Sequence, residues 1–484
     1  MLKNRRVLPL GLAVSAGLVS ILASGSAQAA LCPAQLSAQL DAALNQAPLD
    51  TAYTGLVLQT QGQNARTLYD RNGDRLFTPA SNGKLLTTAA ALHRLGADYR
   101  IRTSIYGTPG PAGSTALRLV GRGDPTITDA EVNSLAQQLT AAGVSQVSLL
   151  VADDSYFSGS ATNPTWEWAD AQFAYAAPVN SLILNRNAIA VQIAPTQVGR
   201  PLSVVAARAL PAGPLALVND SLTVAAAATP LPLALSRTGN SPTLRVTGQM
   251  AQGAAMRSLN LAVLNPAEQF AAALEQGLRQ RSVAVGQRVI TQNPAPAGQE
   301  LAAVLSPPVG ELLRLANRDS DNLSAEVLLK TLGATAGSPR DASQAGAEAI
   351  KTALAELGVN TAPLRVADGS GLSRHNLVSP NALVDTLQAM ATHPQGPGFR
   401  QSLAIAGQSG TLRNRLGGTV LAGRLQGKTG ALTGNVSLSG YVQPPNYEPL
   451  VFSLVINHSN QPASLLREKI DALLLLVVQL RQGC

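Results

Sequence analysis

The chain has 484 residues, of which 45% are hydrophobic and only 13% charged, about half the charged share of an average globular protein. This composition excludes a disordered acidic chain and a coiled coil, and the length suffices for two or three domains. Without Lys3, Arg5 and Arg6, which belong to a leader described next, 33 basic residues face 28 acidic ones, a net charge of +5. No basic cluster is interleaved with aromatic residues, so nucleic acid is not an expected partner.

Residues 1–29 have the pattern of a secretory signal peptide. A basic start is followed by an apolar core over residues 8–22 and by Ala27-Gln28-Ala29, a small-x-small cleavage site. The alternative is an uncleaved anchor, but the apolar run is shorter than the ~20 residues that span a bilayer. The sequence therefore predicts a periplasmic or otherwise extracytoplasmic protein, with at most peripheral membrane contact.

Two cysteines remain after the leader, Cys32 near its end and Cys484 at the end of the sequence. Two free, buried thiols are one interpretation. In an exported protein an isolated pair is more often a disulfide, which here would join the first helix to the last.

The first elements in chain order are a helix over residues 34–46 and a hairpin of strands at 54–60 and 66–69. A helix is then predicted from Ser81 to residue 95. From about residue 100 to 300 the sequence pattern changes to short strand-like segments separated by glycine and proline. Residues 195–255 are rich in proline and predict a small all-β unit. Further predicted elements are strands at 100–106, 147–151 and 188–193 and a helix at 266–280.

The last part of the chain returns to helices and ends in alternating segments. The predicted helices cover residues 308–317, 322–332, 340–357, 379–392 and 462–481, and the predicted strands cover 419–427, 432–442 and 449–457. Three late strands and the early hairpin could build one sheet from both ends of the chain. The middle of the sequence would then be an insertion into that unit.

Ser81-Asn82-Gly83-Lys84 begins the second predicted helix. A serine in a first helical turn lies where free N–H groups and the positive end of the helix dipole stabilise a developing anion. Lys84 lies on the same face and could be the base that takes the serine proton. Alone, the pattern is also typical of a capping serine with a solvated lysine.

Two further motifs add polar groups of the kind that amide chemistry needs. In the Ser-Asp-Asn at 320–322, just before a predicted helix, Ser320 could relay a proton to a leaving amine and Asn322 could hold a substrate amide. In Lys428-Thr429-Gly430, before a predicted strand, Lys428 and Thr429 could bind a carboxylate, and Gly430 lets a substrate backbone lie against the strand edge. Each motif alone is typical of a cap or a turn.

The three motifs in this order resemble those of penicillin-binding proteins and class A β-lactamases. Three more stretches, at 123–125, 368–374 and 409–413, make the chain similar to the three-domain D-alanyl-D-alanine carboxypeptidases/endopeptidases among the low-molecular-mass penicillin-binding proteins. The long interval between Lys84 and Ser320 agrees with that family, which carries an insertion there.

The resemblance implies an α+β fold with a transpeptidase-like catalytic domain, an antiparallel sheet flanked by helices, over residues 30–97 and 300–484. Two nested, β-rich inserted domains would interrupt it. The first would cover residues 98–194 and 256–299, and the second, smaller one residues 195–255.

The same resemblance implies a role for each motif residue. Ser81 would attack the bond between two terminal D-alanines and form an acyl-enzyme that water hydrolyses, with Lys84 as general base and Ser320 as proton relay. The N–H groups of Ser81 and Ala431 would form the oxyanion hole. Asp153 would meet the diamino acid of the peptide.

Ala431 is a departure, because the family usually has a hydroxyl residue after Lys-Thr-Gly. The N–H survives this change, but one contact to the substrate carboxylate is lost, so carboxypeptidase preference is less secure than acylation.

The expected activity is that of a serine-type D-Ala-D-Ala carboxypeptidase, and of a D,D-endopeptidase at the same site. The expected partners are peptidoglycan stem peptides and β-lactams. No cofactor or metal is expected, because neither the histidines nor the cysteines have metal-ligand spacing. Two alternatives keep the fold. A β-lactamase is disfavoured by the long insertion, and a catalytically idle, wall-binding scaffold by the complete set of motif residues.

Overall fold

The structure, a computed structural model, describes residues 31–484 except 111–113, 238–240, 242, 294–297 and 338–339. The predicted signal peptide, residues 1–29, lies outside the described residues. Within the described part of the chain, no helix combines the length and the apolar character needed to cross a membrane.

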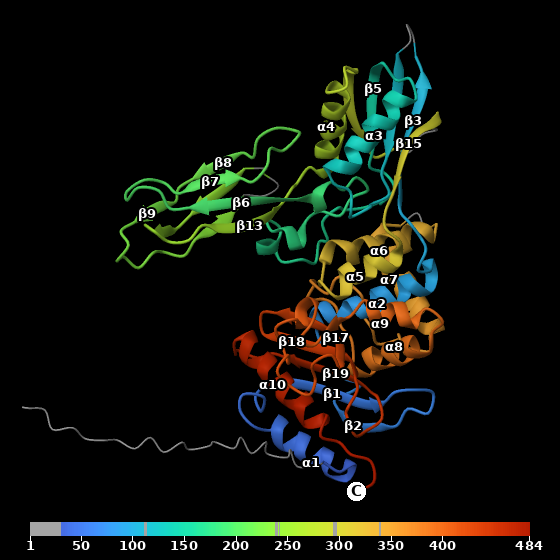
Figure 1. Cartoon of the computed structure of the whole chain (residues 1–484), viewed down its shortest axis with the longest axis vertical. Coiled ribbons are helices and arrows are strands. Elements are labelled where there is room, and N and C mark those ends of the chain that lie inside the picture. Colours follow the sequence, from blue (N-terminus) through green and yellow to red (C-terminus); the bar gives the residue numbers. More distant parts are fainter. Residues whose placement is uncertain (1–30, 111–113, 238–240, 242, 294–297, 338–339) are drawn as a thin grey trace, which may run out of the picture.

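Both ends of the chain contribute to one antiparallel sheet, in the lower half of Figure 1. Its strands, in spatial order, are β16 (Ala404–Ile405), β17 (Leu425–Leu432), β18 (Asn435–Val442), β19 (Leu450–Asn457), β1 (Tyr53–Thr60) and β2 (Thr67–Arg71). β1 pairs with β19 along its whole length, from Tyr53 opposite Asn457 to Thr60 opposite Leu450. The predicted union of the early hairpin with the late strands is confirmed.

The strand predicted at 419–427 is wrong in position. Residues 419–424 form turns, which include the positive φ of Gly423, and β17 begins only at Leu425. The Lys-Thr-Gly motif therefore lies within the strand rather than before it. The short β16 pairs with β17 only at Gln426 and Gly427, so the described strands leave the following part of this edge open.

Helices cover both faces of the sheet. Alternate residues of a strand point to opposite faces, so each strand contributes side chains to two cores. Phe452, Leu454 and Ile456 of β19 face the core under α1 (Pro33–Leu44) and α10 (Ala463–Val477). Val451 and Val455 face the other core. The helices whose side chains fill that second core are α2 (Gly83–Leu95), α5 (Val309–Asn317), α6 (Asn322–Thr335), α7 (Ala342–Glu356), α8 (Pro380–Thr392) and α9 (Gly396–Gln401).

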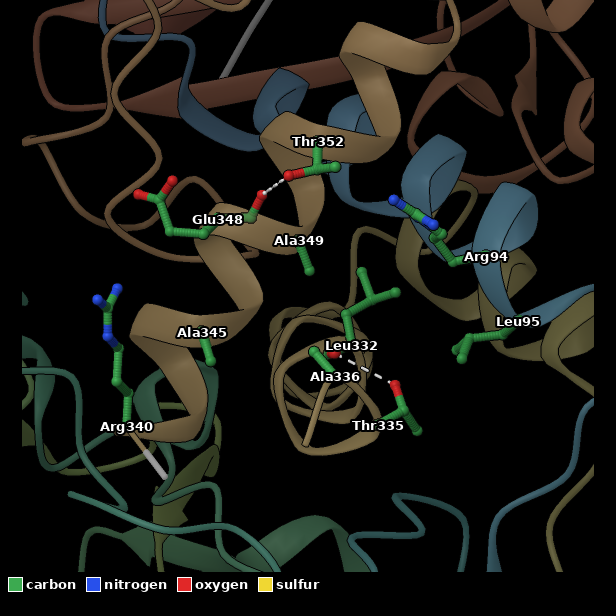
Figure 2. Close-up of a pocket in the computed structure, with 10 residues that line it drawn as sticks. All are labelled: Arg94, Leu95, Leu332, Thr335, Ala336, Arg340, Ala345, Glu348, Ala349 and Thr352. Carbon is green, nitrogen blue, oxygen red and sulfur yellow. Dashed lines mark hydrogen bonds between the residues drawn. The ribbon is translucent and has the colours of Figure 1, made fainter. Parts of the chain in front are cut away.

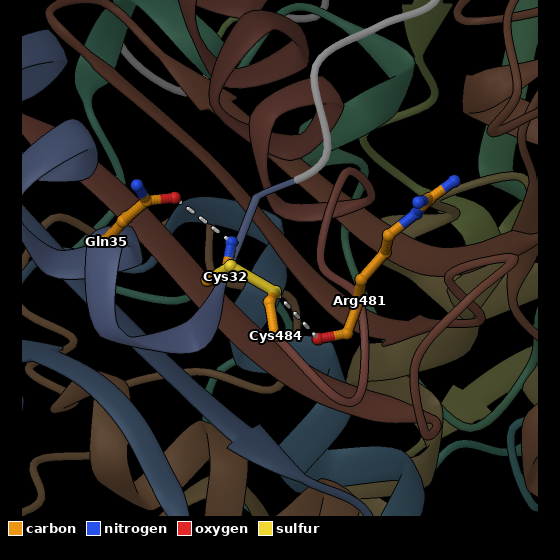
Figure 3. Close-up of a disulfide and its surroundings, with 4 residues drawn as sticks. All are labelled: Cys32, Gln35, Arg481 and Cys484. Carbon is orange, nitrogen blue, oxygen red and sulfur yellow. Dashed lines mark hydrogen bonds between the residues drawn. A yellow bond between two sulfur atoms is a disulfide. The ribbon is translucent and has the colours of Figure 1, made fainter.

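A disulfide joins Cys32, immediately before α1, to Cys484, as Figure 3 shows. The adjoining backbones also pair, since Leu31 N donates to Gln479 O at 3.0 Å and Arg481 N donates to Leu31 O at 3.1 Å. The predicted bridge between the first and the last helical segments is confirmed.

The middle of the chain forms a second, mixed sheet at the upper end of Figure 1. In spatial order its strands are β14 (Ala284–Thr291), β5 (Gln146–Asp153), β4 (Thr115–Val120), β3 (Arg102–Pro109) and β15 (Gln299–Leu305). Two helices pack on it, α4 (Pro266–Arg279) and α3 (Asp129–Ala141). The helix α3 is not among the predicted elements, although Val132, Leu135 and Leu139 have helical spacing and Thr128 caps the helix.

Three small sheets extend to the left in Figure 1 around a core of their own. Their strands are β6 (Ala188–Ala194), β7 (Ser203–Ala206), β8 (Leu217–Asn219), β9 (Leu222–Val224), β10 (Ala234–Ser236), β11 (Leu244–Thr247), β12 (Gln249–Ala251) and β13 (Arg257–Ala262). The division of the insertion into two nested domains, with the boundaries given above, stays a prediction.

Candidate active site

Ser81 lies in a single 3-10 turn, Ala80–Asn82, that leads directly into α2. This turn packs against β17 and β18, so the N-terminal end of α2 meets the sheet at the Lys-Thr-Gly strand. The free N–H groups of a helix start and its dipole favour a negative charge at this place. Asn82, fully buried, holds the strand: in the orientation that satisfies both ends of its amide, its nitrogen donates to Lys428 O at 2.7 Å and its oxygen accepts from the Ser439 hydroxyl at 2.6 Å.

Lys84 lies one turn further along, with no exposed surface. Its Nζ donates to Ser81 Oγ at 3.0 Å, to Asn322 Oδ1 at 2.7 Å and to Ser370 O at 2.6 Å. Burial lowers the pKa of Lys84 from 10.5 to about 8, against the opposing effect of nearby carboxylates, of which Asp368 acts most strongly. An amine with such a pKa can release its proton near neutral pH and accept another one from the serine.

The loop 368–373 supplies the carbonyl that holds Lys84. The buried Glu326 of α6 accepts hydrogen bonds from Gly369 N at 3.0 Å and from Ser370 N at 2.8 Å. Asp368 accepts from Gly371 N at 2.7 Å and from Ser373 N at 2.6 Å. Two buried carboxyl groups therefore fix the backbone whose Ser370 carbonyl contacts the amine.

Burial and the neighbouring Asp368 carboxylate together raise the pKa of Glu326 to about 7.

The Ser-Asp-Asn motif precedes and begins α6. Asp321 caps the helix by accepting from Ser324 N at 2.9 Å, and Ser320 adopts a left-handed φ of 61°. Arg186, from the inserted region, forms an ion pair with Asp321. Asn322 is held at both ends, because its oxygen accepts from Lys84 and its Nδ2 donates to Tyr175 O at 2.8 Å.

Lys428 joins the third motif to the second. Its Nζ donates to Ser320 Oγ at 2.8 Å and to Thr429 O at 2.8 Å, and its side chain has no exposed surface. Burial, together with the positive charge of Lys84, lowers the pKa of Lys428 well below its usual value. The structure thus brings Ser81, Lys84 and Ser320 together with Asn322 and Lys428, as the sequence predicts.

Two cavities open on either side of Ser81 along β17. The first, of about 400 Å³, extends past Ala431 to Thr433. The second, of about 360 Å³, follows the strand in the other direction, past Gly430 to Thr429. Ser81 and Ser320 line both. The motif residues therefore stand at the middle of a groove that runs along the open edge of the strand.

Several residues that line these cavities have no role assigned from the sequence. The first cavity has mixed charge, because it contains Glu167, Asp170 and Arg374, of which Glu167 and Arg374 form an ion pair. The side chain of Tyr175, whose hydroxyl donates to Asp170 at 2.8 Å, also lines it. The second cavity contains Thr411, Arg415 and Arg467. Arg374 and Thr411 lie in the family-like stretches 368–374 and 409–413, whereas the other residues have no spacing in the sequence that predicts their positions.

Asp153 lies elsewhere. It is the last residue of β5, is buried, and accepts two hydrogen bonds from Arg118, at 2.9 Å and 2.7 Å. The structure does not bring it to either cavity that contains Ser81. Its proposed contact with a diamino acid stays a prediction.

A third hollow, of about 500 Å³, lies between α2, α6 and α7. Figure 2 shows Arg94 and Leu95 at one side and Arg340, Ala345 and Glu348 at the other. It contains none of the motif residues, and we assign no chemistry to it.

The geometry of the groove is that of nucleophilic catalysis. A serine at a helix start has a buried amine within hydrogen-bond reach, and a second serine beside it is held by a second buried amine. In the described residues, no group of three or more His, Cys, Asp or Glu side chains is placed to hold a metal ion.

Comparison with known proteins assigns a family to this arrangement. Residues 36–476 match the D-Ala-D-Ala carboxypeptidase 3 (S13) family. A D-alanyl-D-alanine carboxypeptidase of Actinomadura sp. (strain R39) is 35% identical over 451 residues, which cover 89% of this chain and 82% of that protein. The D-alanyl-D-alanine carboxypeptidase DacB of Haemophilus influenzae is 26% identical over 83% of this chain and 85% of its own.

Solved structures agree with these relatives. The crystal structure of penicillin binding protein 4 (dacB) from Haemophilus influenzae superposes with a TM-score of 0.79 and 26% identity, covering 91% of this chain and 97% of that one. A second structure of the same protein, complexed with a novel β-lactam, gives a TM-score of 0.77 at 24% identity over 90% of this chain and 97% of that chain.

Proposed function

The chain belongs to the D-Ala-D-Ala carboxypeptidase 3 (S13) family and is a serine-type D-Ala-D-Ala carboxypeptidase, and on that premise we propose that Ser81 is the residue it acylates. One observation carries this assignment. The Ser81 hydroxyl accepts a hydrogen bond from the fully buried amine of Lys84, 3.0 Å away, and the pKa of that amine is lowered to about 8. A serine is a weak nucleophile until such a base takes its proton.

The proposed reaction has two steps. In the first, Ser81 Oγ bonds to the carbonyl carbon of the penultimate D-alanine while its proton passes to Lys84 Nζ. The C–N bond then breaks, and the leaving amine takes the proton that Lys84 received, passed through the hydroxyl of Ser320, which Lys428 holds at 2.8 Å, so that Lys84 is neutral again. In the second step, water gives a proton to Lys84 and attacks the ester, which releases the shortened peptide and restores Ser81.

The negative charge on the carbonyl oxygen would be stabilised by the N–H groups of Ser81 and Ala431. Two features support this part of the proposal. Ser81 lies in the turn that starts α2, and Ala431 lies on the open edge of β17, with both residues lining the two cavities. Asn322, held by Lys84 and by the carbonyl of Tyr175, would accept or donate a hydrogen bond at the substrate amide.

The mixed charge of the first cavity supports a substrate with a zwitterionic side chain. Asp170 and Glu167 would meet the ammonium group of a diamino acid, and Arg374 its carboxylate. This gives the stem peptide of peptidoglycan a place on the Thr433 side of Ser81. It is an alternative to Asp153, which lies outside the cavity.

The same site would act on cross-linked peptides as a D,D-endopeptidase and would be acylated by β-lactams. The names of the relatives support a substrate in the cell wall and hence a location outside the cytoplasmic membrane. The disulfide between Cys32 and Cys484 supports an oxidising compartment.

The test is the mass of the intact protein after brief exposure to benzylpenicillin. We expect an adduct of one penicillin on the wild type and on Ser258→Ala, an exposed serine of β13, and none on Ser81→Ala. An adduct on Ser81→Ala would show that another residue is acylated. Destruction of penicillin without an adduct would favour a β-lactamase, and intact penicillin without an adduct a catalytically idle scaffold.

A further inference from the structure

A further cavity, of about 580 Å³, lies beside the Ser-Asp-Asn motif, and we call it the side cavity. The end of α5 and the start of α6 line it on one side, and segments of the insertion, among them β6 and β13, line it on the other. It shares Tyr175, Ser320 and Asn322 with the first cavity beside Ser81, but only Ser320 with the second. The side cavity therefore adjoins the first cavity and leads away from β17.

The diamino acid of a stem peptide is a branch point, and this decides which part of the substrate reaches the side cavity. Its carboxyl group leads through the penultimate D-alanine to Ser81, and its side chain enters the first cavity in the function proposed above. Its amine carries the amino-terminal part of the stem, which needs a path of its own. Asn322, proposed to contact the substrate amide, lies where the first cavity and the side cavity adjoin. The side cavity therefore gives the amino-terminal part of the stem a place.

Tyr175 forms the corner between these two cavities and is held by three contacts. Its carbonyl accepts a hydrogen bond from Asn322 Nδ2 at 2.8 Å, and its hydroxyl donates to Asp170 at 2.8 Å. Its ring stacks on that of Phe173, with the ring centroids 5.5 Å apart. Because these contacts fix the corner, a peptide that branches at the diamino acid meets a preformed edge there.

Each acidic group that lines the side cavity has an arginine beside it. Asp321 forms an ion pair with Arg186, which also lines the cavity. Asp319 Oδ2 lies 4.0 Å from Arg314 Nη1. The opposite charges in these pairs offset each other, so they leave little net charge for a ligand.

Arg208 is the remaining charged residue of the side cavity, and it is half-buried just after β7. Its Nη2 donates to Ala188 O at 3.2 Å, and no acidic side chain pairs with it in the described part of the chain. A guanidinium has five N–H groups in a planar fork that suits a carboxylate. The unpaired charge of Arg208 is therefore available to an anionic group of a ligand.

We propose that the side cavity binds the amino-terminal part of the stem peptide, and that Arg208 pairs there with a carboxylate of the residue that precedes the diamino acid. The inference rests on the proposed acylation of Ser81 and on the proposed place of the diamino acid in the first cavity. It gives the small β-rich part of the insertion, from which Arg208 comes, a role in substrate binding. An amide in place of that carboxylate would lose the charge-assisted contact with Arg208.

The test compares three peptides with the same diamino acid-D-Ala-D-Ala end. The amine of the diamino acid carries an acetyl group in the first, a γ-linked D-glutamyl residue with a free α-carboxylate in the second, and the α-carboxamide of that residue in the third. For the wild type we expect kcat/KM at least about tenfold higher for the second peptide than for the third, the effect of one charge-assisted hydrogen bond. Arg208→Gln should lower this ratio to about threefold or less, mainly by raising KM for the second peptide, and should leave hydrolysis of the acetylated peptide unchanged. Arg208→Lys, which keeps the charge, should retain most of the preference.

The control is Arg257→Gln, which removes an exposed arginine at the start of β13 that does not line the side cavity. It should keep the ratio of the wild type. If the wild type does not distinguish the two glutamyl peptides, or if Arg208→Gln keeps the preference, the proposed side-cavity site is wrong while the acylation proposal stands. The same conclusion follows if the wild type forms a penicillin adduct but hydrolyses none of the three peptides. If it hydrolyses none of them and gives no adduct, both proposals are wrong.

Discussion

At the residue scale, the proposed chemistry depends on a lysine that burial has brought close to losing its proton. The pKa of Lys84 is lowered to about 8, and only the neutral amine can take the proton of Ser81. As pH rises through about 8, the neutral fraction grows, so acylation by benzylpenicillin should speed up and then level off. Below pH 7 the rate should fall about tenfold for each pH unit.

The measurement is the second-order rate of adduct formation between pH 6 and 10, with thermal unfolding checked at each pH. Lys84→Arg is the matched variant, because a guanidinium keeps its proton throughout this range. It should react no faster than Ser81→Ala at any pH. A wild-type rate that does not change between pH 6 and 8 would mean that Lys84 is not the base.

Glu326 provides a second residue-scale prediction, because it acts on Lys84 through the backbone of Gly369 and Ser370. Glu326→Ala leaves two buried N–H groups unpaired, at a cost of about 1–3 kcal/mol each, and should slow acylation at least about tenfold. Glu326→Gln keeps an acceptor oxygen and should retain most of the rate. Its pH midpoint should shift downward, since the negative charge that raises the pKa of Lys84 is lost.

Adduct formation by both variants, measured over the same pH range, checks this prediction. Asp385→Asn is the control, because the pKa of Asp385 is raised by burial to about 6 but its α8 site faces Asp74 rather than Lys84. It should leave the profile unchanged. Equal rates for Glu326→Ala and the wild type would remove Glu326 from any role in positioning Lys84.

At the element scale, the loop 368–373 and the turn before α2 fit together so closely that one position has no room for a side chain. Gly371 has a φ of +79°, and a Cβ atom there would lie 1.9 Å from Ala80 O and 3.1 Å from Ser81 N. Gly371→Ala must therefore displace the turn that carries the nucleophile. We expect acylation to fall at least about a hundredfold, as misplacement of a catalytic group by about 1 Å does.

Gly358→Ala is the matched comparison, because Gly358 has a similar φ of +84° but open space around it. This variant should carry the cost of backbone strain alone, about 1–2 kcal/mol of stability, and should acylate at the wild-type rate. The two rates and the two melting temperatures, measured together, separate strain from displacement. Equal acylation by both alanine variants would contradict the proposed fit.

Elements with a strong local pattern could be predicted from the sequence, and elements defined by their neighbours could not. Leu36, Leu40 and Leu44 have helical spacing and lie in the core under α1. The predicted strand at 419–427 begins several residues before the observed β17. The open edge of β17 and its glycines blur the alternation that marks a strand. The helix α3 was missed because its short aliphatic face lies among proline-rich and glycine-rich segments.

At the scale of the whole molecule, the motif residues could be found because each carries its own local signature. Ser81 and Lys84 are one helical turn apart, and the residues around 320 and 428 each form a recognisable short motif. Asp170 and Arg467 could not be found in this way. They reach the groove from segments far from any motif, and only the packing of the insertion and of α10 brings them there. The domain boundaries and the role of Asp153 stay predictions.

The inserted segment also contacts the loop that holds Lys84. Trp166 Nε1 donates to Asp368 Oδ2 at 2.9 Å, and Asn163 Nδ2 donates to Ala367 O at 2.8 Å. Both contacts bind the inserted segment to the loop that holds Lys84. The position of the base therefore depends on residues about 285 positions further along the chain, which in turn are held by the insertion.

Trp166→Phe tests this dependence, because it keeps an aromatic ring but removes the indole N–H that donates to Asp368, together with part of the bicyclic ring. The loss of a hydrogen bond to a charged group should loosen the loop 368–373 and slow acylation by about fivefold or more, while the protein stays folded. Trp168→Phe is the control two residues away, since that side chain is 66% exposed and makes no side-chain hydrogen bond among the described residues. If both variants acylate like the wild type, the insertion binds substrate without positioning the catalytic base.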